Sequence, residues 1–379
     1  MGRRLRIAMV TETYPPEVNG VARTVALMAE GLQRRGHSIQ LVRPRQNGHD
    51  FAGDMPGFQT VLRPGIPIPR YTQLRMGMPS QRALERCWKD ERPQIVHIAT
   101  EGPLGWSALA AARRLELPVA TDFHTNFHTY MRDYGMAWLA RPVAAYLRAF
   151  HNRAGCTMVP TREIAEDLAG QRFERLRVVG RGVDPAVFSP ARRSQALRAS
   201  WGAEDNTLVA MCVSRFAHEK NFALVIEAYE AMRRIRPDAK LVLVGDGPLV
   251  NDLRKKNVGT IIAGRKVNGE LSKHYASGDV FLFPSMTETW GNVTLEAMAS
   301  GLGIVAYDYA AAREVLRHGE SALLAPFGDS AAFIAHAERL AGGAALARSL
   351  GKEARKAAEN LTWERIVADF EGVLLDLAS

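Results

Sequence analysis

Two glutamates, Glu288 and Glu296, stand eight positions apart in the stretch 284-PSMTETWGNVTLEAMASG-301, with a Trp-Gly-Asn turn between them. Paired carboxylates in an enzyme often act as an acid and a nucleophile or base. Eight helical residues would separate the two by about 12 Å of rise, whereas the carboxyl pairs of glycosidases lie about 5 to 9.5 Å apart. A chain reversal at Gly291 would bring them nearer. The spacing therefore counts against an acid–base pair without excluding it.

The segment between the two glutamates has the features of an anion site. Residues 293–300 have a helical pattern closed by Gly301, and we expect Asn292 to be the N-cap, which would place Glu296 in the first turn. Backbone amides at a helix N-terminus attract negative charge. We expect the amides of residues 290–294 to bind an anion while the glutamates accept hydrogen bonds from a sugar at one end and a ribose at the other.

Two cations, Arg215 and Lys220, follow a buried apolar strand in 213-VSRFAHEKN-221. An arginine can bind two oxygens at once and a lysine acts as a point charge, so the pair suits the two phosphates of a nucleotide diphosphate. A solvated basic loop would account for the same two residues equally well.

A third candidate anion contact lies near the N-terminus. The apolar run 5–10 ends in the loop 15-PPEVNGVAR-23, which leads into a helical pattern. Gly20 stands at the start of that helix, where a missing side chain lets backbone N–H groups approach an anion closely. A tight loop that binds nothing is the alternative, since a loop with one glycine is a weak signal.

Two histidines, His124 and His128, are spaced four residues apart in 121-TDFHTNFHTY-130. This spacing could form a metal pair on a helix, but no third ligand or HExxH pattern accompanies it. We therefore expect no metal. His124 directly follows an apolar strand and is expected to face the site, and His128 is expected to lie on the surface or in packing.

Two other stretches resemble functional motifs. The stretch VGDGPL resembles a dinucleotide fingerprint and raises an NAD-dependent oxidoreductase as an alternative, but Val250 stands where the third Gly or Ala belongs. The aromatic stretch 134–150 is expected to be a helix that packs its apolar face. With the arginines around it the same stretch could instead lie on a membrane.

Length and composition restrict the class of protein. The 379 residues suffice for two domains, and 47% hydrophobic with 23% charged residues is ordinary for a globular chain. The basic N-terminus has too short an apolar run for a signal peptide, and no run approaches the ~20 apolar residues of a membrane span. Three scattered cysteines suit a reducing compartment.

The net charge of +9 is concentrated in the first half of the chain. Residues 1–184 hold 26 Lys+Arg against 17 Asp+Glu, a difference of +9, and residues 185–379 hold 23 against 23. A merely basic surface or attraction to an anionic membrane would each explain this excess. No aromatic-basic interleaving or known module indicates a nucleic-acid partner.

Short apolar runs alternate with amphipathic helical stretches along both halves of the chain. Nearly continuous apolar strands separated by helices predict parallel sheets covered on both faces. We therefore predict an α/β fold of two doubly wound, Rossmann-like domains that face each other across a cleft. The Gly- and Pro-rich stretch 180–190 is the expected break, and ligands are expected beyond the carboxyl ends of the strands.

These motifs together resemble the retaining GT-B glycosyltransferases of glycosyltransferase family 4. The resemblance covers nearly the whole chain and comprises PPEVNG, HTNFHTY, the Gly-Val-Asp at 182–184, SRFAHEKN, VGDGP and the two-glutamate stretch. It divides the chain into an acceptor-binding domain at 1–184, a donor-binding domain at 185–360 and a helix at 361–379 that returns to the first domain. His128 stands where related sequences often carry Asp.

The resemblance also implies roles for single residues. It assigns Arg215 and Lys220 to the donor diphosphate, Glu296 to the ribose, Glu288 to the transferred sugar and His124 to the sugar or the reacting centre. The remaining donor contacts that it implies are Asn19, Gly20, Gly264, Arg265, Lys266, Val267, Trp290, Gly291, Asn292 and Val293.

The implied activity is metal-independent transfer of a hexose, with retention and without a bound cofactor, from a nucleotide diphosphate sugar. Among bacterial members the chain resembles GDP-mannose-dependent α-mannosyltransferases and related glycolipid glycosyltransferases. The implied acceptor is a lipid or a lipid-linked glycan, and the implied place is the cytoplasmic face of the inner membrane, in peripheral contact with anionic lipid. A UDP-sugar-dependent glucosyl, glucuronosyl or sulfoquinovosyl transferase is the alternative.

Overall fold

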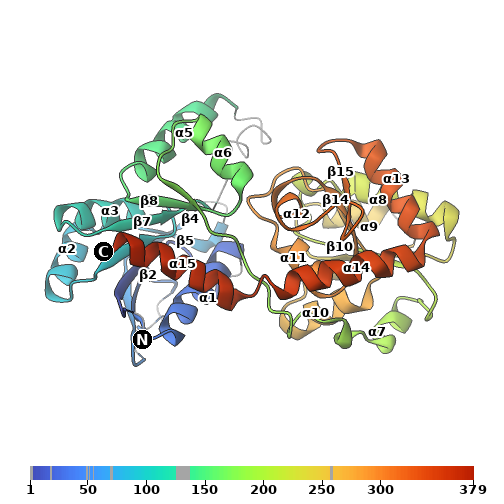
Figure 1. Ribbon diagram of the computed structural model, residues 1–379, viewed down its shortest axis with the longest axis horizontal. Helices are drawn as coiled ribbons and strands as arrows, with labels where there is room; N and C mark the ends of the chain where they lie inside the picture. Colours follow the sequence, from blue (N-terminus) through green and yellow to red (C-terminus); the bar gives the residue numbers. More distant parts are fainter. Residues whose placement is uncertain are drawn as a thin grey trace. The chain divides into compact units, whose positions relative to one another are not determined.

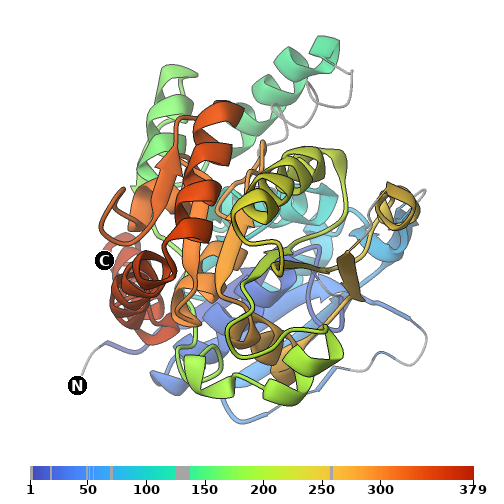
Figure 2. The ribbon, with the colours of Figure 1, turned by 90° about the vertical axis from the view of Figure 1, so that its right-hand side faces the viewer.

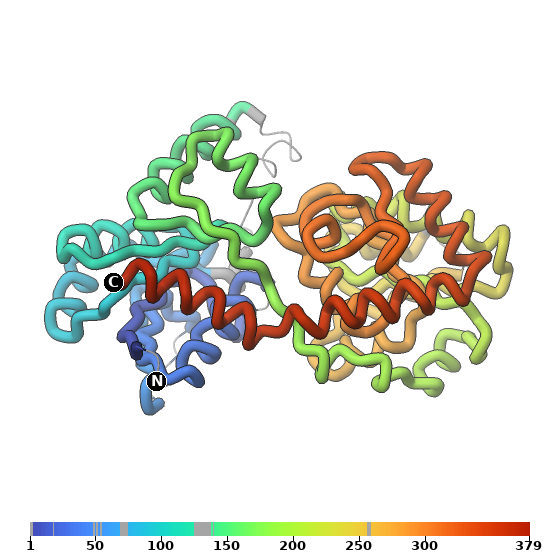
Figure 3. The backbone as a smooth tube through the Cα atoms, viewed as in Figure 1, coloured from blue at the N-terminus to red at the C-terminus, as the bar shows by residue number. Residues whose placement is uncertain are grey.

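The computed structural model describes residues 3–17, 19–47, 50, 52–53, 55–68, 71–124, 137–256 and 259–379. The chain divides into two compact units, of which unit 1 is Met1–Arg181 with Trp363–Ser379 and unit 2 is Gly182–Thr362 (Figure 1). Both chain ends belong to unit 1 (Figure 3), where Arg3 donates a hydrogen bond of 2.9 Å to the carbonyl of Ala378. The acceptor and donor roles of the domains stay predictions.

Unit 1 is built on a seven-stranded sheet with the order β3-β2-β1-β6-β7-β8-β9, in which every neighbouring pair is parallel. A separate antiparallel pair is formed by β4 and β5. The strands are β1 (Arg6–Val10), β2 (Ser38–Pro44), β3 (Phe58–Arg63), β4 (Gly65–Ile68), β5 (Tyr71–Gly77), β6 (Ile95–Ile98), β7 (Val119–Asp122), β8 (Cys156–Val159) and β9 (Leu176–Val178).

The helices of unit 1 cover both faces of this sheet. They are α1 (Gly20–Arg34), α2 (Gln81–Asp90), α3 (Pro103–Arg114), α5 (Ala137–His151), α6 (Arg162–Gly170) and the C-terminal α15 (Trp363–Leu377). Residues of α1 and α15 pack on one face with Ile7 and Met9, and residues of α2 and α3 pack on the other with Ala8 and Val10. This alternation along β1 is the two-residue period of a strand buried on both sides.

The C-terminal helix α15 lies beside α1 at the other end of the sequence (Figure 3). A Cβ atom on Gly31 of α1 would stand 2.5 Å from a methyl carbon of Val367, so the absence of a side chain lets the two helices approach. Further along α15, Glu371 accepts a hydrogen bond of 2.6 Å from Arg35, the C-cap of α1, and lies 2.6 Å from Nε2 of buried His37. The last helix is therefore an integral layer of unit 1.

Unit 2 is built on a six-stranded sheet with the order β12-β11-β10-β13-β14-β15, again parallel at every pair. Its strands are β10 (Val209–Val213), β11 (Lys240–Val244), β12 (Thr260–Gly264), β13 (Val280–Phe283), β14 (Gly303–Tyr307) and β15 (Leu323–Ala325). Its helices are α7 (Gln195–Ser200), α8 (Phe222–Ile235), α9 (Val250–Lys256), α10 (Asn268–Ser277), α11 (Asn292–Ala299), α12 (Ala310–Val315), α13 (Ser330–Gly342) and α14 (Ala344–Glu359).

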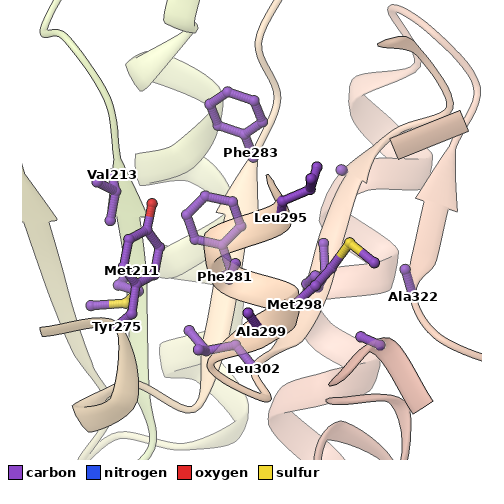
Figure 4. Packing of buried hydrophobic residues seen from close by; sticks show 14 of the residues in the cluster. Met211, Val213, Tyr275, Phe281, Phe283, Leu295, Met298, Ala299, Leu302 and Ala322 are labelled. Carbon is purple, nitrogen blue, oxygen red and sulfur yellow. The ribbon is translucent and has the colours of Figure 1, made fainter. Parts of the chain in front are cut away.

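Both faces of this second sheet are also covered. Met211, Val213 and Phe281 pack with α10 and α11 on one face (Figure 4). On the other face α8 and α13 lie side by side (Figure 2) and pack on the intervening strand residues such as Cys212 and Leu243. The predicted pair of parallel, doubly wound α/β units is confirmed.

Five strands were not predicted from the sequence, namely β3, β4, β5, β9 and β15. Each is an outermost strand of its sheet, and β9 and β15 are only three residues long. A three-residue strand is too short to show a two-residue period, and β3 has only one fully buried residue, Phe58.

Candidate active site

Unit 2 has its topological switch point between β10 and β13. From β10 the chain continues outward through β11 and β12, and from β13 it continues in the opposite direction through β14 and β15. In open parallel sheets ligands bind beyond the carboxyl ends of the two strands at such a point. Arg215 and Lys220 follow β10, and Glu288 follows β13, so the predicted donor residues lie on the two strands that flank the switch point.

The structure joins Lys220 and Glu288 directly. Nζ of Lys220 donates a hydrogen bond of 2.5 Å to Oε1 of Glu288, and both side chains are only 15% exposed. Oγ of Ser285 donates to the same carboxylate oxygen at 2.9 Å. The backbone of Glu288 is held as well, since the hydroxyl of Tyr309 donates to its carbonyl at 2.8 Å. A cation and a carboxylate separated by 68 positions in the sequence therefore form an ion pair in the site.

Arg215 is paired with a second carboxylate, Glu219, which the sequence reasoning missed. The guanidinium donates to Oε1 of Glu219 at 2.6 Å, and the arginine side chain is 46% exposed while the glutamate side chain is 4% exposed. Burial alone would raise the pKa of Glu219, but hydrogen bonds from Arg215 and from the glutamate's own backbone, together with the charges of Arg215 and Lys220, outweigh it and the pKa is lowered. The spacing of four residues was the signal that could have revealed this pair.

The glycines of the VGDGP stretch pack against the Arg215 segment. Gly245 and Gly247 have φ angles of +147° and +156°. A Cβ atom would stand 1.9 Å from the carbonyl oxygen of Ser214 at the first position and 2.5 Å from that of Phe216 at the second. The glycines are thus required for close contact between two loops after β11 and β10, which accounts for them without a dinucleotide.

The helix that carries Glu296 begins one residue earlier than predicted. Gly291, with φ of +96°, is the N-cap of α11, and Asn292 is the first helical residue. The prediction of Asn292 as N-cap, with Glu296 in the first turn, is therefore wrong: the left-handed backbone at the reversal of the chain is one that glycine adopts without strain. Glu296 is 6% exposed.

Two buried polar atoms at the start of α11 have no protein partner within the described part of the chain. They are Nε1 of Trp290 and Oδ1 of Asn292. Val293 follows Asn292 in the first turn of the helix. An unpaired donor and an unpaired acceptor next to a helix N-terminus are suited to a polar ligand.

The predicted base-binding residues lie at the end of the outermost strand, β12. Gly264 ends that strand with φ of +71°, and its carbonyl accepts a hydrogen bond of 3.1 Å from the amide of Gly245. Arg265 is exposed, Lys266 is half-buried and Val267 is 50% exposed. These four residues are thus at the same sheet edge as Arg215 and open to solvent.

In unit 1, Asn19 and Gly20 stand at the start of α1 as predicted for a helix that begins there. Asn19 is the N-cap, and its side-chain oxygen accepts a hydrogen bond of 2.8 Å from the amide of Ala22 while its Nδ2 donates to Thr13 at 2.7 Å. Gly20 is exposed. The side chain of Asn19 is occupied by its own helix and loop, so the exposed Gly20 amide is the better candidate contact.

His124 follows β7 in unit 1 and lies between two charged side chains. Its Nε2 is 3.1 Å from Oδ2 of Asp122, and its Nδ1 is 3.1 Å from a guanidinium nitrogen of Arg181. Burial lowers the pKa of His124, and the nearby Arg181 lowers it further although Asp122 opposes this. His128 lies outside the described residues.

Two more carboxyl groups lie at the strand ends of unit 1. Glu12 follows β1 and accepts hydrogen bonds from the amides of Gly77 and Leu104. Glu101 follows β6, is 8% exposed, and has an Oε1 atom without a partner among the described residues. Burial raises the pKa of Glu101 to about 7, and its own backbone amide only partly opposes this.

Groups of three or more His, Cys, Asp or Glu side chains arranged for a metal are not found in the described residues. Over the same residues, no helix is long and apolar enough to cross a membrane.

Comparison with known proteins places these features in a family. The model of Glycosyltransferase Family 4 matches residues 18–187, and that of Glycosyl transferases group 1 matches residues 207–342. A GDP-mannose-dependent alpha-mannosyltransferase of Mycobacterium tuberculosis (strain CDC 1551 / Oshkosh) is 33% identical over 86% of this chain and 85% of its own length. An alpha-monoglucosyldiacylglycerol synthase of Streptococcus pneumoniae is 28% identical over 80% of this chain and 71% of its own.

Solved structures support the fold. The sucrose-phosphate synthase of Thermosynechococcus elongatus superposes with a TM-score of 0.78 at 18% identity, covering 99% of both chains. At this identity the likeness concerns the fold alone, and it confirms the predicted GT-B fold.

Proposed function

The chain belongs to glycosyltransferase family 4, and from this premise we propose that it moves a hexose, with retention, from a nucleotide diphosphate sugar to a hydroxyl group of a lipid or lipid-linked acceptor. GDP-mannose is the donor we propose first. The observation that carries the proposal is the joining of Lys220 and Glu288 at the switch point of unit 2, with Arg215 on the same strand end. A diphosphate needs cations and a sugar needs a hydrogen-bonding carboxylate, and the two lie together there.

The donor would be bound in segments. Arg215 and Lys220 would bind the diphosphate, helped by the N-terminus of α11. Glu288 would accept hydrogen bonds from the sugar hydroxyls, and Glu296 would accept them from the ribose. The unpaired polar atoms of Trp290 and Asn292 support a ligand at the start of α11.

The other proposed donor contacts lie at the ends of three different strands or loops. The residues at the end of β12, from Gly264 to Val267, would hold the base. Gly291 and Val293 would offer backbone amides, and the exposed amide of Gly20 in unit 1, with Asn19 as its cap, would meet the distal phosphate. His124 would stand near the transferred sugar.

The reaction follows from these contacts. The bond between the anomeric carbon and the diphosphate oxygen breaks, and the acceptor oxygen bonds to the same face of that carbon. The departing phosphate oxygen takes the acceptor's proton. Arg215, Lys220 and the helix dipole neutralise the charge that develops on the leaving group, so this scheme requires no metal.

The choice of donor sugar rests on the relatives. The mannosyltransferase is more similar than the glucosyl relative, at 33% against 28% identity, and this supports GDP-mannose. A UDP-sugar-dependent glucosyl, glucuronosyl or sulfoquinovosyl transferase is the second candidate. Relatives at this level of identity differ in donor, so the base and the sugar must be measured.

A lipid acceptor is supported by the name of the S. pneumoniae relative and by the surface of α5. Trp138 on that helix is 76% exposed and Tyr146 is 45% exposed. Arg141 between them is exposed too. Aromatic and basic side chains on one helix suit the interface of an anionic membrane, and the charge excess of residues 1–184 points the same way. We propose peripheral contact with the cytoplasmic face of the inner membrane.

The experiment that tests the proposal is a donor screen. Purified protein is incubated with GDP-, UDP- and ADP-sugars and with vesicles made from a bacterial lipid extract, and released nucleoside diphosphate is measured. We expect release with GDP-mannose and a new glycolipid in the vesicles. Release with a UDP-sugar alone would support the second candidate, and no release with any donor would contradict both.

A further inference from the structure

A buried group of charged and polar side chains in unit 1 is not explained by donor binding. Its centre is Asp122, the last residue of β7, with an exposed fraction of 2%. His124 lies two positions later, with a side chain that is 6% exposed. Arg181, the last residue of unit 1 before the chain enters unit 2, is 5% exposed. Residues 57 positions apart are therefore packed together in the interior.

The hydrogen bond between Arg181 and His124 fixes where the imidazole carries its proton. An arginine guanidinium can only donate hydrogen bonds. Its nitrogen lies 3.1 Å from Nδ1 of His124, so Nδ1 must be the acceptor and carry no proton. A neutral imidazole then holds its proton on Nε2, which lies 3.1 Å from Oδ2 of Asp122 but has no hydrogen-bond partner among the described residues.

The backbone holds Arg181 in place for this contact. Its other terminal nitrogen, Nη1, donates to the carbonyls of Val179 and Gly180, each at 3.1 Å. The guanidinium is therefore oriented by its own chain and not by His124. Because an imidazolium would direct a second N–H at the guanidinium, this arrangement rejects the charged form of the ring.

The charges of the group balance across the imidazole. Arg181 keeps its positive charge, since guanidinium groups in proteins are effectively always protonated. Burial by itself would raise the pKa of Asp122, but the imidazoles of His124 and His97 outweigh it and the pKa is held well below the usual range. The neutral ring of His124 thus lies between a carboxylate and a guanidinium.

We propose that Arg181 is a positioning residue that holds His124 as a neutral imidazole with its proton on Nε2, and that Asp122 balances the buried charge of Arg181. Arg181 fixes the tautomer, and Asp122 supplies the charge that makes a buried guanidinium tolerable. Neither residue is assigned a contact with substrate.

This inference deepens the proposed function, on which its catalytic part rests. A neutral His124 that never gains a proton can orient a sugar hydroxyl or shape the pocket, but it cannot serve as a general acid near neutral pH. It also places no positive charge beside the departing diphosphate. The rate of transfer should therefore not follow the titration of this histidine.

The direct test is nitrogen NMR of protein labelled in its ten histidines, with the His124 signal assigned from the His124→Gln variant. Between pH 5.5 and 8 we expect the shifts of a neutral ring protonated on Nε2, without titration. Among the described residues, the ionisable groups that face His124 are Asp122, Arg181, His97 and His151, and Asp122 is also near Glu101 and Cys156. An imidazolium signal in this range, or a proton on Nδ1, would overturn the proposal. No substrate is required, so the outcome is independent of the donor screen.

Two variants separate the positioning role from a structural one. Arg181→Lys keeps a donor-only cation and should keep the Nε2–H tautomer and most of the activity. Arg181→Met removes the donor, so the His124 signal should begin to titrate and kcat should fall about 10-fold, the effect of losing one hydrogen bond, with little change in the KM for the donor. A wild-type spectrum and rate in Arg181→Met would refute the role of Arg181.

The matched control is the other histidine–carboxylate pair of unit 1. Glu371→Gln alters the partner of buried His37, 2.6 Å away, and should shift only the His37 signal while leaving the His124 signal and kcat unchanged. If Arg181→Met does not fold, the wild-type titration and Arg181→Lys still decide the question.

Discussion

The strand ends of the two sheets carry opposite kinds of chemistry. In unit 2, each cation at the switch point has its own carboxylate, Arg215 with Glu219 and Lys220 with Glu288, and the pairs are partly open to solvent. In unit 1, three carboxyl groups gather at the ends of β1, β6 and β7, namely those of Glu12, Glu101 and Asp122, and all three are largely buried.

The difference indicates which ligand each unit can accept. A paired cation can exchange its carboxylate for a phosphate when an anion arrives, because the total charge of the site stays low. A group of buried carboxyls repels an anion but can accept hydrogen bonds from neutral hydroxyl groups. This contrast supports the proposal that unit 2 binds the anionic nucleotide sugar and unit 1 the neutral, hydroxyl-bearing acceptor.

The strongest test of this contrast is Lys220→Ala. Removing a cation from the leaving-group site should lower kcat by roughly 100- to 1,000-fold, the size seen when one stabilising donor of a developing anion is lost. The measurement is nucleoside diphosphate release with the donor found in the screen. Lys273→Ala, which removes an exposed lysine of α10 paired with Glu270, should leave the rate unchanged, and equal rates in the two variants would refute the assignment.

The second test concerns the free energy of unfolding that is lost because the carboxyl of Glu101 is buried. The pKa of Glu101 is raised from 4.5 to about 7 in the folded protein. Between these values the native state binds more protons than the unfolded state, so the free energy of unfolding decreases as pH rises. The shift lowers the free energy of unfolding by about 3 kcal/mol. This loss is absent below pH 4.5 and complete above pH 7.

Glu101→Gln should remove this cost. Denaturant unfolding at pH 5 and pH 8 should show a variant that gains stability over the wild type on going to pH 8. Glu91→Gln, at an exposed carboxyl of the same unit, should show no such gain. If Glu101→Gln gains nothing between the two pH values, Glu101 is ionised at low pH and the contrast between the units is weaker than described.

The smallest expected effect is that of replacing Glu288, which should strengthen the binding of a nucleoside diphosphate but weaken the turnover of the nucleotide sugar. In Glu288→Gln, Lys220 loses its charged partner, so a nucleoside diphosphate should bind about 3- to 10-fold more tightly, as expected for a partly buried ion pair. Turnover of the nucleotide sugar should fall in the same variant, because the sugar loses a carboxylate. Calorimetry with UDP and GDP checks the first effect, and weaker diphosphate binding would show that Lys220 does not exchange partners.

Much of this arrangement follows from local sequence pattern. Apolar runs such as that of β10 recur between helical stretches, and they require parallel sheets with both faces covered. The strand-end positions of Arg215, Lys220 and Glu288 follow from the same pattern, because a polar residue directly after a buried strand lies at the carboxyl edge of the sheet.

Other features could not be read in this way. Five edge strands were missed, among them β9 and β15, which are only three residues long. The start of α11 was misplaced by one residue because a left-handed Gly291 replaced a side-chain cap. Glu219 was overlooked because its partner is exposed and a glutamate beside a lysine is common on surfaces.

The sequence by itself determined two doubly wound units, most of their strands in chain order and the candidates for binding a nucleotide diphosphate. Only the tertiary structure decided which side chains meet: Lys220 with Glu288 across 68 positions, and His124 with Arg181 across 57. The physical reason is that periodicity and capping act over a few residues. The pairing of charges depends on which strands become neighbours and on how much water their packing excludes.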